Sequence, residues 1–207
     1  MSSISIIGAG NMSRTLGARA LAGGNTVEIL ARDTSKAVAL AESLGEGATT
    51  GEWGTAPVGD IVILALLADG VVPAASQFGE SLAGKAIVDI SNPFNATFDG
   101  LDHSEETSIA QEVAKVVPAS ASVMKGFNTI FRHVLEKGSP AVFIAGDDAQ
   151  AKARVETFIT SLGLQPLDAG GLKMAHWLEG AGLLSVALAN NGVGNLDFSL
   201  GVDTLSA

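Results

Sequence analysis

The feature that most constrains the fold is a glycine-rich turn placed directly after a short apolar run. Residues 4–10 have the sequence ISIIGAG, and residues 11–22 then carry apolar side chains at helical spacing. Gly23 and Gly24 provide a natural end for that helix. A strand that turns through glycines into a helix is typical of the first half of a βαβ unit. We therefore expect an α/β protein built on a parallel sheet.

The rest of the chain alternates short apolar runs with helical patterns, in the order expected of a parallel sheet buried on both faces. Strands are expected at residues 4–7, 27–31, 61–66, 86–90, 122–127, 141–145 and 164–168. Helices are expected at residues 11–22, 33–44, 70–82, 108–117, 147–162 and from 172 onward, with Pro73 near the first turn of its helix. Five glycines in residues 45–59 indicate a loop, with room for one short strand.

Composition narrows the possible classes of function. The chain has 207 residues, 47% of them hydrophobic, enough to fill one core or two small lobes. Its 12 Lys and Arg against 22 Asp and Glu give a formal charge of −10, which disfavours nucleic acid and anionic membranes as partners. Cysteine and tyrosine are absent, which excludes thiolate catalysis, disulfides and a tyrosine proton donor. The longest apolar run, residues 61–68, is far shorter than the roughly 20 residues of a membrane span, so we expect a soluble cytoplasmic protein.

The glycine turn has the spacing of a dinucleotide-binding fingerprint, except that Ser13 replaces its third glycine. Gly8 permits the tight turn, and Gly10 lets the backbone approach a pyrophosphate that the amino end of the helix attracts. The third position serves helix-to-strand packing, where alanine is also accepted, so Ser13 should be tolerated. Gly17, one turn later, should keep the same helix face small. We expect a bound dinucleotide; a glycine turn without a ligand is the alternative.

The end of the second expected strand distinguishes the two nicotinamide coenzymes. A free ribose hydroxyl requires an acid there, whereas a 2′-phosphate requires a cation. The sequence is EILARDTSK, in which Glu28 lies too early and Arg32 follows the strand, with Ser35 and Lys36 beside it. This pattern favours NADP. The alternative is that Arg32 and Lys36 are the solvated start of a helix capped by Asp33.

Together these motifs resemble the small NADP oxidoreductases typified by NADPH:coenzyme F-420 (F420) reductase, whose domain also occurs in membrane metalloreductases. The resemblance rests on IIGAGNMS, LARDTSK, VDISNPF, VMKGFNTI and DAGGLKMAHWLE, and it covers nearly the whole chain. It implies a Rossmann-type fold with a doubly wound parallel sheet. Residues 1–128 would form the NADP-binding domain, and residues 129–207 would form a small C-terminal α/β lobe that completes the acceptor cleft. The sequence departs from the family pattern at Ser13, at Leu67, where proline is common, and at His176, where arginine is common.

The resemblance also implies that Ser91, Asn92 and Pro93 end a strand beside the nicotinamide ribose, and that Lys125, Phe127 and Asn128 line the nicotinamide end. A simple turn at residues 92–93, a core position for Phe127 and a solvated Lys125 are the alternatives. The candidate cofactor contacts are Gly8, Gly10, Asn11, Met12, Ser13, Arg32, Ser35, Lys36, Ala65, Leu66, Ser91, Asn92, Pro93, Lys125, Phe127 and Asn128.

The histidines and tryptophans are weaker candidates. His103 lies in a polar segment and is expected to be solvated, whereas His133 is expected at the surface or at a helix end. The spacing of the three histidines does not suggest a metal site. His176 and Trp177 fall where the family places part of its acceptor pocket, although a core tryptophan is the commoner explanation. Trp53 could stack on a planar acceptor or anchor its glycine-rich loop.

The predicted function is an NADPH-dependent oxidoreductase that transfers hydride between NADP(H) and a deazaflavin (F420) or flavin-like acceptor. Such a transfer needs positioning rather than a catalytic acid or base, because the two cofactors carry the redox chemistry. An NADP(H)-binding redox sensor without turnover and a reductase of another small substrate, such as an imine, are the alternatives. The family and the apolar segment at residues 182–189 also suggest a homodimer.

Overall fold

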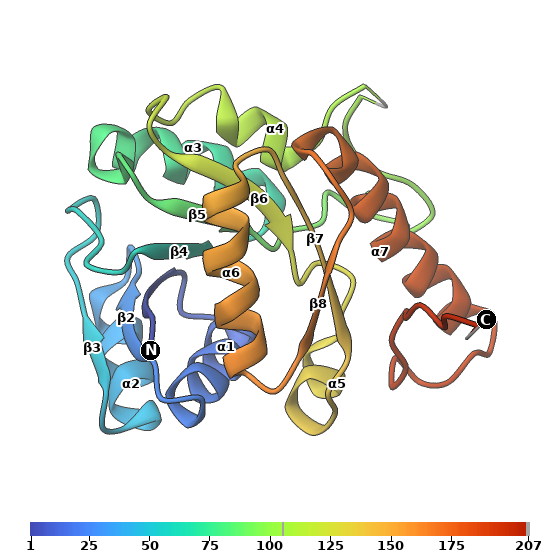
Figure 1. Cartoon of the computed structure of the whole chain (residues 1–207), viewed down its shortest axis with the longest axis horizontal. Coiled ribbons are helices and arrows are strands. Elements are labelled where there is room, and N and C mark those ends of the chain that lie inside the picture. The colour runs from blue at the N-terminus through green and yellow to red at the C-terminus, as the bar shows by residue number, and fades with distance from the viewer. Residues whose placement is uncertain (105, 206–207) are drawn as a thin grey trace.

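The structure, a computed structural model, describes residues 1–104 and 106–205, and these form one eight-stranded sheet with helices on both faces (Figure 1). The strands are β1 (Ser3–Ile7), β2 (Thr26–Leu30), β3 (Ala48–Thr50), β4 (Ile61–Leu64), β5 (Ala86–Asp89), β6 (Ser122–Gly126), β7 (Ala141–Gly146) and β8 (Gln165–Asp168). Their order is β3-β2-β1-β4-β5-β6-β7-β8, and β6–β7 is the antiparallel neighbour pair among otherwise parallel strands. The expected Rossmann-type α/β fold is confirmed.

Alternate side chains of β1, β2, β4, β5 and β6 enter two hydrophobic clusters on opposite faces of the sheet. The helices are α1 (Asn11–Ala22), α2 (Thr34–Leu44), α3 (Ala68–Phe78), α4 (Ile109–Ala114), α5 (Arg132–Lys137), α6 (Ala149–Ser161) and α7 (Ala175–Asn190), with short 3-10 turns at Gly79–Leu82 and Leu172–Met174. Helices α1, α2 and α6 contribute to one cluster, and α3, α4 and the first residue of α7 to the other. Both faces of the sheet are therefore covered, as its nearly continuous apolar strands require.

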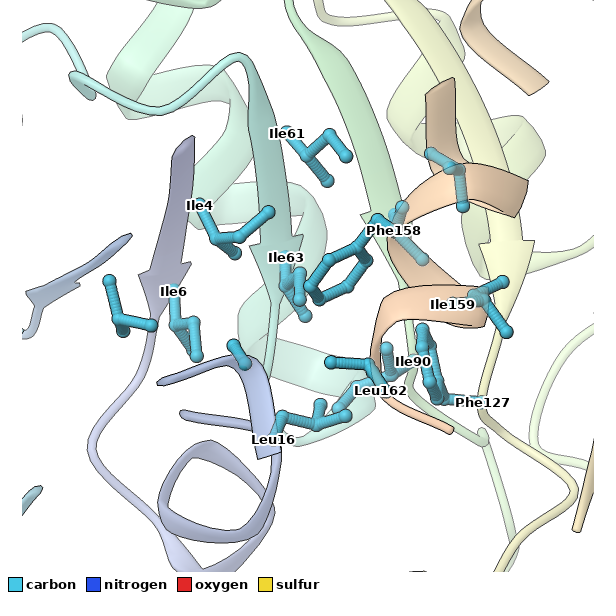
Figure 2. Close-up of a cluster of buried hydrophobic side chains, with 14 of the residues drawn as sticks. Ile4, Ile6, Leu16, Ile61, Ile63, Ile90, Phe127, Phe158, Ile159 and Leu162 are labelled. Carbon is cyan, nitrogen blue, oxygen red and sulfur yellow. The ribbon is translucent and has the colours of Figure 1, made fainter. Parts of the chain in front are cut away.

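The sheet and the core continue past residue 128, where the sequence suggested a boundary. Strand β7 pairs with β6 across that point. Figure 2 shows Phe158 of α6 and Leu162, the residue that follows this helix, in one cluster with Leu16 of α1 and Ile63 of β4. In addition, Arg19 of α1 donates hydrogen bonds to the carbonyl oxygens of three residues beyond the boundary, namely Leu135, Gly138 and Leu162. Residues 129–207 thus share both their sheet and their core with residues 1–128.

Most expected elements are present, including the short strand for which residues 45–59 had room, and two details differ. The glycine-rich segment at 45–59 contains the short strand β3, and the expected loop surrounds it. Helix α3 begins two residues earlier than expected, so Pro73 is its sixth residue and lies in the second turn, where its missing N–H removes one helical hydrogen bond. The short helix α5 was not expected, because its six residues are too few to show a helical period.

The register places the carboxyl ends of β1, β2, β4 and β5 together at one edge of the sheet. Ile7 of β1 pairs with Leu30 of β2 and with Leu64 of β4, and Leu64 pairs with Asp89 of β5. Strands β1 and β4 are parallel neighbours, but the order in which successive strands join the sheet reverses between them. Such a switch point opens a crevice at the carboxyl ends of parallel strands. Within the described residues, no helix is both long and apolar enough to cross a membrane.

Candidate cofactor site

Two adjoining cavities lie along the carboxyl ends of β1, β2, β4 and β5. The first cavity, of about 410 Å³, is lined by Gly8, Ala9, Gly10, Ala31, Arg32, Asp33, Lys36, Trp53, Leu66, Leu67 and Gly70. The second cavity, of about 500 Å³, is lined by Leu67, Ala68, Asp69, Asn92, Pro93, Phe94, Phe98, Asp102 and Ile109. Leu67 borders both cavities and is 82% exposed. The two cavities therefore adjoin at Leu67 over the switch point, and together they are called the groove.

The glycine turn forms the floor of the first cavity. Gly8 has a φ of 129°, and a Cβ added to it would lie 2.3 Å from the carbonyl oxygen of Ala65. A Cβ added to Gly10 would meet nothing within 4 Å, so the space above this residue is open. Gly10 is also the N-cap of α1 and supplies no side-chain cap, which leaves the first N–H groups of that helix facing the cavity. These are the features that bind an anion at a helix start.

Ser13 fills the third position of the fingerprint, as expected, but its hydroxyl has no hydrogen-bond partner among the described residues. The side chain is fully buried, and Oγ makes no hydrogen bond to any residue that the structure describes. Gly17, expected to help α1 approach the sheet, instead faces α2, where an added Cβ would lie 2.9 Å from Cδ1 of Leu44. The turn therefore carries an unsatisfied polar group in its packing layer.

Removing that hydroxyl should stabilise the protein. An unpartnered buried hydroxyl costs about 1–3 kcal/mol, so Ser13→Ala is expected to raise the free energy of unfolding by about 1 kcal/mol. Ser5 is a matched control, since it is equally buried but donates to Glu28 and accepts from the N–H of Gly59. Ser5→Ala should lower the free energy. Urea unfolding of both variants measures the two changes, and a destabilised Ser13→Ala would show that the hydroxyl is bonded.

Arg32 occupies the rim of the first cavity beside Trp53. Its guanidinium carbon lies 5.3 Å from the centre of the indole ring, a cation–π distance. Trp53 is held in turn by an edge-to-face contact with Phe78 of α3, at 5.1 Å between ring centres. In the described part of the chain, Arg32 donates no hydrogen bond to a side chain or carbonyl, so its donors stay available. Trp53 thus borders the Arg32 end of the groove.

The acidic side chains near this rim already accept hydrogen bonds from groups of the protein. Asp33 caps α2 by accepting from the N–H groups of Ser35 and Lys36, and also from the hydroxyl of Ser35. That hydroxyl first, and then the N–H of Lys36, keep the pKa of Asp33 below its usual value. Glu28 is buried within β2, where it accepts from Ser5 and from the N–H of Val58. Glu28 therefore does not reach the groove, whereas Asp33 lines the first cavity and accepts all of these bonds through Oδ1.

Paired asparagines form the wall of the second cavity. Asn92 Nδ2 donates to the carbonyl of Asn128 at 2.7 Å, and Asn128 Nδ2 donates to Asn92 Oδ1 at 2.9 Å and to the carbonyl of Leu178 at 2.8 Å. These bonds join the ends of β5 and β6 to α7. Asn128 Oδ1 and the hydroxyl of Ser91 are buried and have no hydrogen-bond partner among the described residues. Two polar atoms with unused bonding capacity therefore lie at these strand ends.

Lys125 and Phe127 lie behind these walls rather than on them. The ammonium of Lys125 is fully buried between Asp89 Oδ2 at 2.7 Å and Glu179 Oε1 at 2.6 Å. The other carboxylate oxygen of Asp89 accepts from the N–H of Ser91, so the ion network fixes the turn that follows β5. Phe127 has a φ of 59° and belongs to the core. A solvated position for Lys125 is thereby excluded.

The structure places the candidate contacts in three groups. Gly8, Gly10, Arg32, Lys36 and Leu66 line the first cavity, and Asn92 and Pro93 line the second. Ser91 and Asn128 are buried and line neither cavity, although Asn128 donates a hydrogen bond to Asn92 in the lining of the second. The remaining candidates, which line neither cavity, are Asn11, Met12, Ser13, Ser35, Ala65, Lys125 and Phe127.

Two expectations about the weaker candidates are wrong. His103 is not solvated: its side chain is 11% exposed and lies against Glu179 of α7. Trp177 is not a core residue, since it is 66% exposed on α7. His133 is half-buried, its ring is stacked on that of Phe131, and its Nε2 has no hydrogen-bond partner among the described residues. Sequence spacing missed the approach of His103 to α7 because the contact joins residues 76 positions apart.

Comparison with known proteins, like the groove, points to an NADP-dependent oxidoreductase. Residues 3–93 match the model of the family described as NADP oxidoreductase coenzyme F420-dependent. The chain is 30% identical over 180 residues to Metalloreductase STEAP3 of Rattus norvegicus. That alignment covers 85% of this chain but 35% of the relative, so the chain spans only a minor part of the relative's length.

Two solved structures are similar along most of their length. A protein from Arthrobacter sp. FB24 described as an F420-dependent NADP-reductase has a TM-score of 0.81 at 26% identity, covering 92% of this chain and 95% of its own. A hypothetical protein from Sinorhizobium meliloti has a TM-score of 0.74 at 28% identity, covering 83% and 86%. These comparisons support an NADP-dependent oxidoreductase. Over residues 3–93, this chain carries the domain of the F420-dependent NADP oxidoreductase family, as its motifs predicted.

Proposed function

We propose that this protein is an NADPH-dependent oxidoreductase that passes hydride to F420 or another flavin-like acceptor. The observation that carries the proposal is the pair of adjoining cavities over the switch point. Its first cavity has a glycine floor and the available cation of Arg32, whereas its second cavity has the aromatic side chains of Phe94 and Phe98. One end is therefore suited to a phosphorylated nucleotide and the other to a planar ring system.

The residues present fit NADPH at three points. The uncapped amino end of α1 and the open space over Gly10 suit the pyrophosphate. Arg32 and Lys36 at the rim suit a 2′-phosphate. At the other end, Asn92 lines the cavity and can bond an amide or a ribose hydroxyl, while the unpartnered Ser91 hydroxyl and Asn128 Oδ1 are buried.

When bound, NADPH supplies the hydride, and the protein supplies position. The hydrogen bonds between Asn92 and Asn128 and the ion network beneath them hold the strand ends rigid. Leu67, Phe94 and Phe98 present apolar surface that would exclude water from between two stacked rings. Asp69 and Asp102 line the same cavity and can accept hydrogen bonds from ring N–H groups. Positioning of this kind accounts for a reaction without a tyrosine or cysteine.

Stopped-flow mixing tests the proposal directly. Rapid mixing of the protein and NADPH with F420, and separately with FMN and FAD, should bleach the visible absorbance of at least one acceptor at a rate proportional to enzyme concentration. Saturable NADPH binding without turnover on any of the three would replace this function with that of a redox sensor. Absence of NADPH binding would reject both functions.

The homodimer, the cytoplasmic location and the division of labour between residues 1–128 and 129–207 stay predictions. Exposed apolar side chains on α7, Trp177 and Leu184, provide a surface that a second copy could cover. Sedimentation velocity on the full chain measures the mass in solution and so tests the dimer.

Trp53 should contribute to coenzyme choice by holding Arg32 over the cavity. Cation–π contacts at partly exposed sites contribute about 0.5–1 kcal/mol, so Trp53→Leu is expected to reduce the preference for NADPH over NADH about two- to fivefold. The ratio of the two dissociation constants cancels effects common to both coenzymes. Trp177→Leu, at the other tryptophan, is the control and should leave the ratio unchanged. An unchanged ratio in Trp53→Leu would show that the loop merely packs on Phe78.

A further inference from the structure

We propose that His103, His176 and Glu179 form a binding site for a first-row divalent cation, for which zinc is the reference metal. This site is separate from the groove and does not depend on the proposed function. Its three residues come from the segment that follows β5 and from one turn of α7. The possible ligand atoms of all three lie within 4.8 Å of one another.

The histidine tautomers are fixed by backbone carbonyls. Nδ1 of His103 lies 2.7 Å from the carbonyl oxygen of Ser104, and Nδ1 of His176 lies 3.1 Å from that of Thr107. A carbonyl oxygen can only accept, so both Nδ1 atoms carry a proton. In a neutral ring, Nε2 then carries the lone pair. Metal-binding histidines have this arrangement, with the second ring nitrogen donating to a carbonyl or carboxylate.

The contact between His103 and Glu179 requires a positive charge. Nε2 of His103 lies 2.6 Å from Oε2 of Glu179. A ring nitrogen lone pair and a carboxylate oxygen repel at this distance unless a cation lies between them. That cation is either a proton, carried by His103 or by Glu179, or a metal ion. The ring of His176, 5.7 Å from that of His103 between centres, is near enough to supply a further nitrogen.

Glu179 has one carboxylate oxygen, Oε2, left for this cation, because neighbouring groups occupy Oε1. Oε1 of Glu179 already accepts from the ammonium of Lys125 at 2.6 Å and from the N–H of Ile109 at 3.0 Å. Lys125 also neutralises Asp89, so two buried carboxylates share one ammonium. The network therefore has one uncompensated negative charge, which lies on the side where Oε2 faces His103. A cation bound there would balance it.

Two imidazoles and one carboxylate are a donor set for zinc and neighbouring metals. A bond of about 2.0–2.1 Å to each nitrogen would require His103 and Glu179 to separate slightly. His103 can do so because it belongs to the segment between β5 and α4 and not to a helix or strand. A bound cation would also tie this segment, which includes Asp102 of the second cavity, to α7.

Spectroscopy on the full chain tests the site with zinc and cobalt chlorides as probes. The ring of Trp177 lies 5.3 Å from that of His176, so paramagnetic Co²⁺ should quench its fluorescence. A Trp53→Phe background leaves Trp177 as the sole emitter. We expect saturation at one equivalent, visible absorption bands of nitrogen-ligated Co²⁺, and competition by Zn²⁺. His103→Ala and His176→Ala should each weaken binding at least about tenfold, while His133→Ala should not.

Titration of the wild-type protein with zinc tests the proposed site even where a variant fails to fold. Zinc binding should raise the melting temperature of wild type in a concentration-dependent way. Absence of saturable binding, or equal affinity in wild type and a folded His176→Ala variant, would overturn the proposal. The contact would then be an ion pair between an imidazolium at His103 and Glu179.

Discussion

Replacing Lys125 by methionine is expected to lower the free energy of unfolding by about 3–5 kcal/mol, because the change removes one partner of a buried ion network. Methionine keeps the length of the side chain but supplies no charge. Asp89 and Glu179 would then lie fully buried without the ammonium that both contact. Desolvation of two carboxylates is the source of the large effect.

Lys115 provides the matched control for this variant. Its ammonium lies 2.7 Å from Glu112, the distance that also separates Lys125 from Asp89, but the Lys115 side chain is 64% exposed. Lys115→Met should therefore change stability by less than about 1 kcal/mol. Urea unfolding of both variants gives the two values. Equal losses would mean that burial does not decide the strength of these pairs.

Much of the fold could be predicted because its signals are local. The apolar runs gave the strands, and glycines and capping residues such as Asp33 marked the helix ends. Gly8 and Gly10 identified the glycine turn as a nucleotide site, because their spacing reflects the geometry of one turn. Helix α5 was missed because its six residues carry too little periodicity. Pro73 was placed in the first turn of its helix because α3 begins two residues before the expected start.

The charged and polar parts of the site were harder to predict, because their partners are distant in sequence. A lysine in a strand gives no sign that Glu179 lies beside it, since that contact joins residues 54 positions apart. His103 appeared to be solvated for the same reason. Arg32 was identified by its place after β2, whereas its contact with Trp53 depends on how the glycine-rich loop folds back. Long-range pairing, rather than local pattern, decides which charges are available to a ligand.

Replacing Arg32 by alanine should reduce the preference for NADPH over NADH about 10- to 100-fold. A charge-assisted hydrogen bond contributes about 1.5–3 kcal/mol, and 1.4 kcal/mol corresponds to a factor of ten. NADH affinity should change little, because Arg32 donates to no other group in the described residues and its loss leaves no buried partner unpaired. Isothermal titration with both coenzymes measures the ratio. Arg154→Ala, an exposed arginine on α6, changes the net charge equally and should leave the ratio unchanged.

The double variant Arg32→Ala, Trp53→Leu separates the two contributions. If Trp53 acts by holding the guanidinium, its replacement should have no further effect on the coenzyme ratio once Arg32 is gone, since the two residues would form one unit. Additive losses would mean that Trp53 contacts the coenzyme itself. An unchanged ratio in Arg32→Ala alone would contradict the assignment of the 2′-phosphate to this rim. Lys36, the other cation that lines the first cavity, would then be the next residue to test.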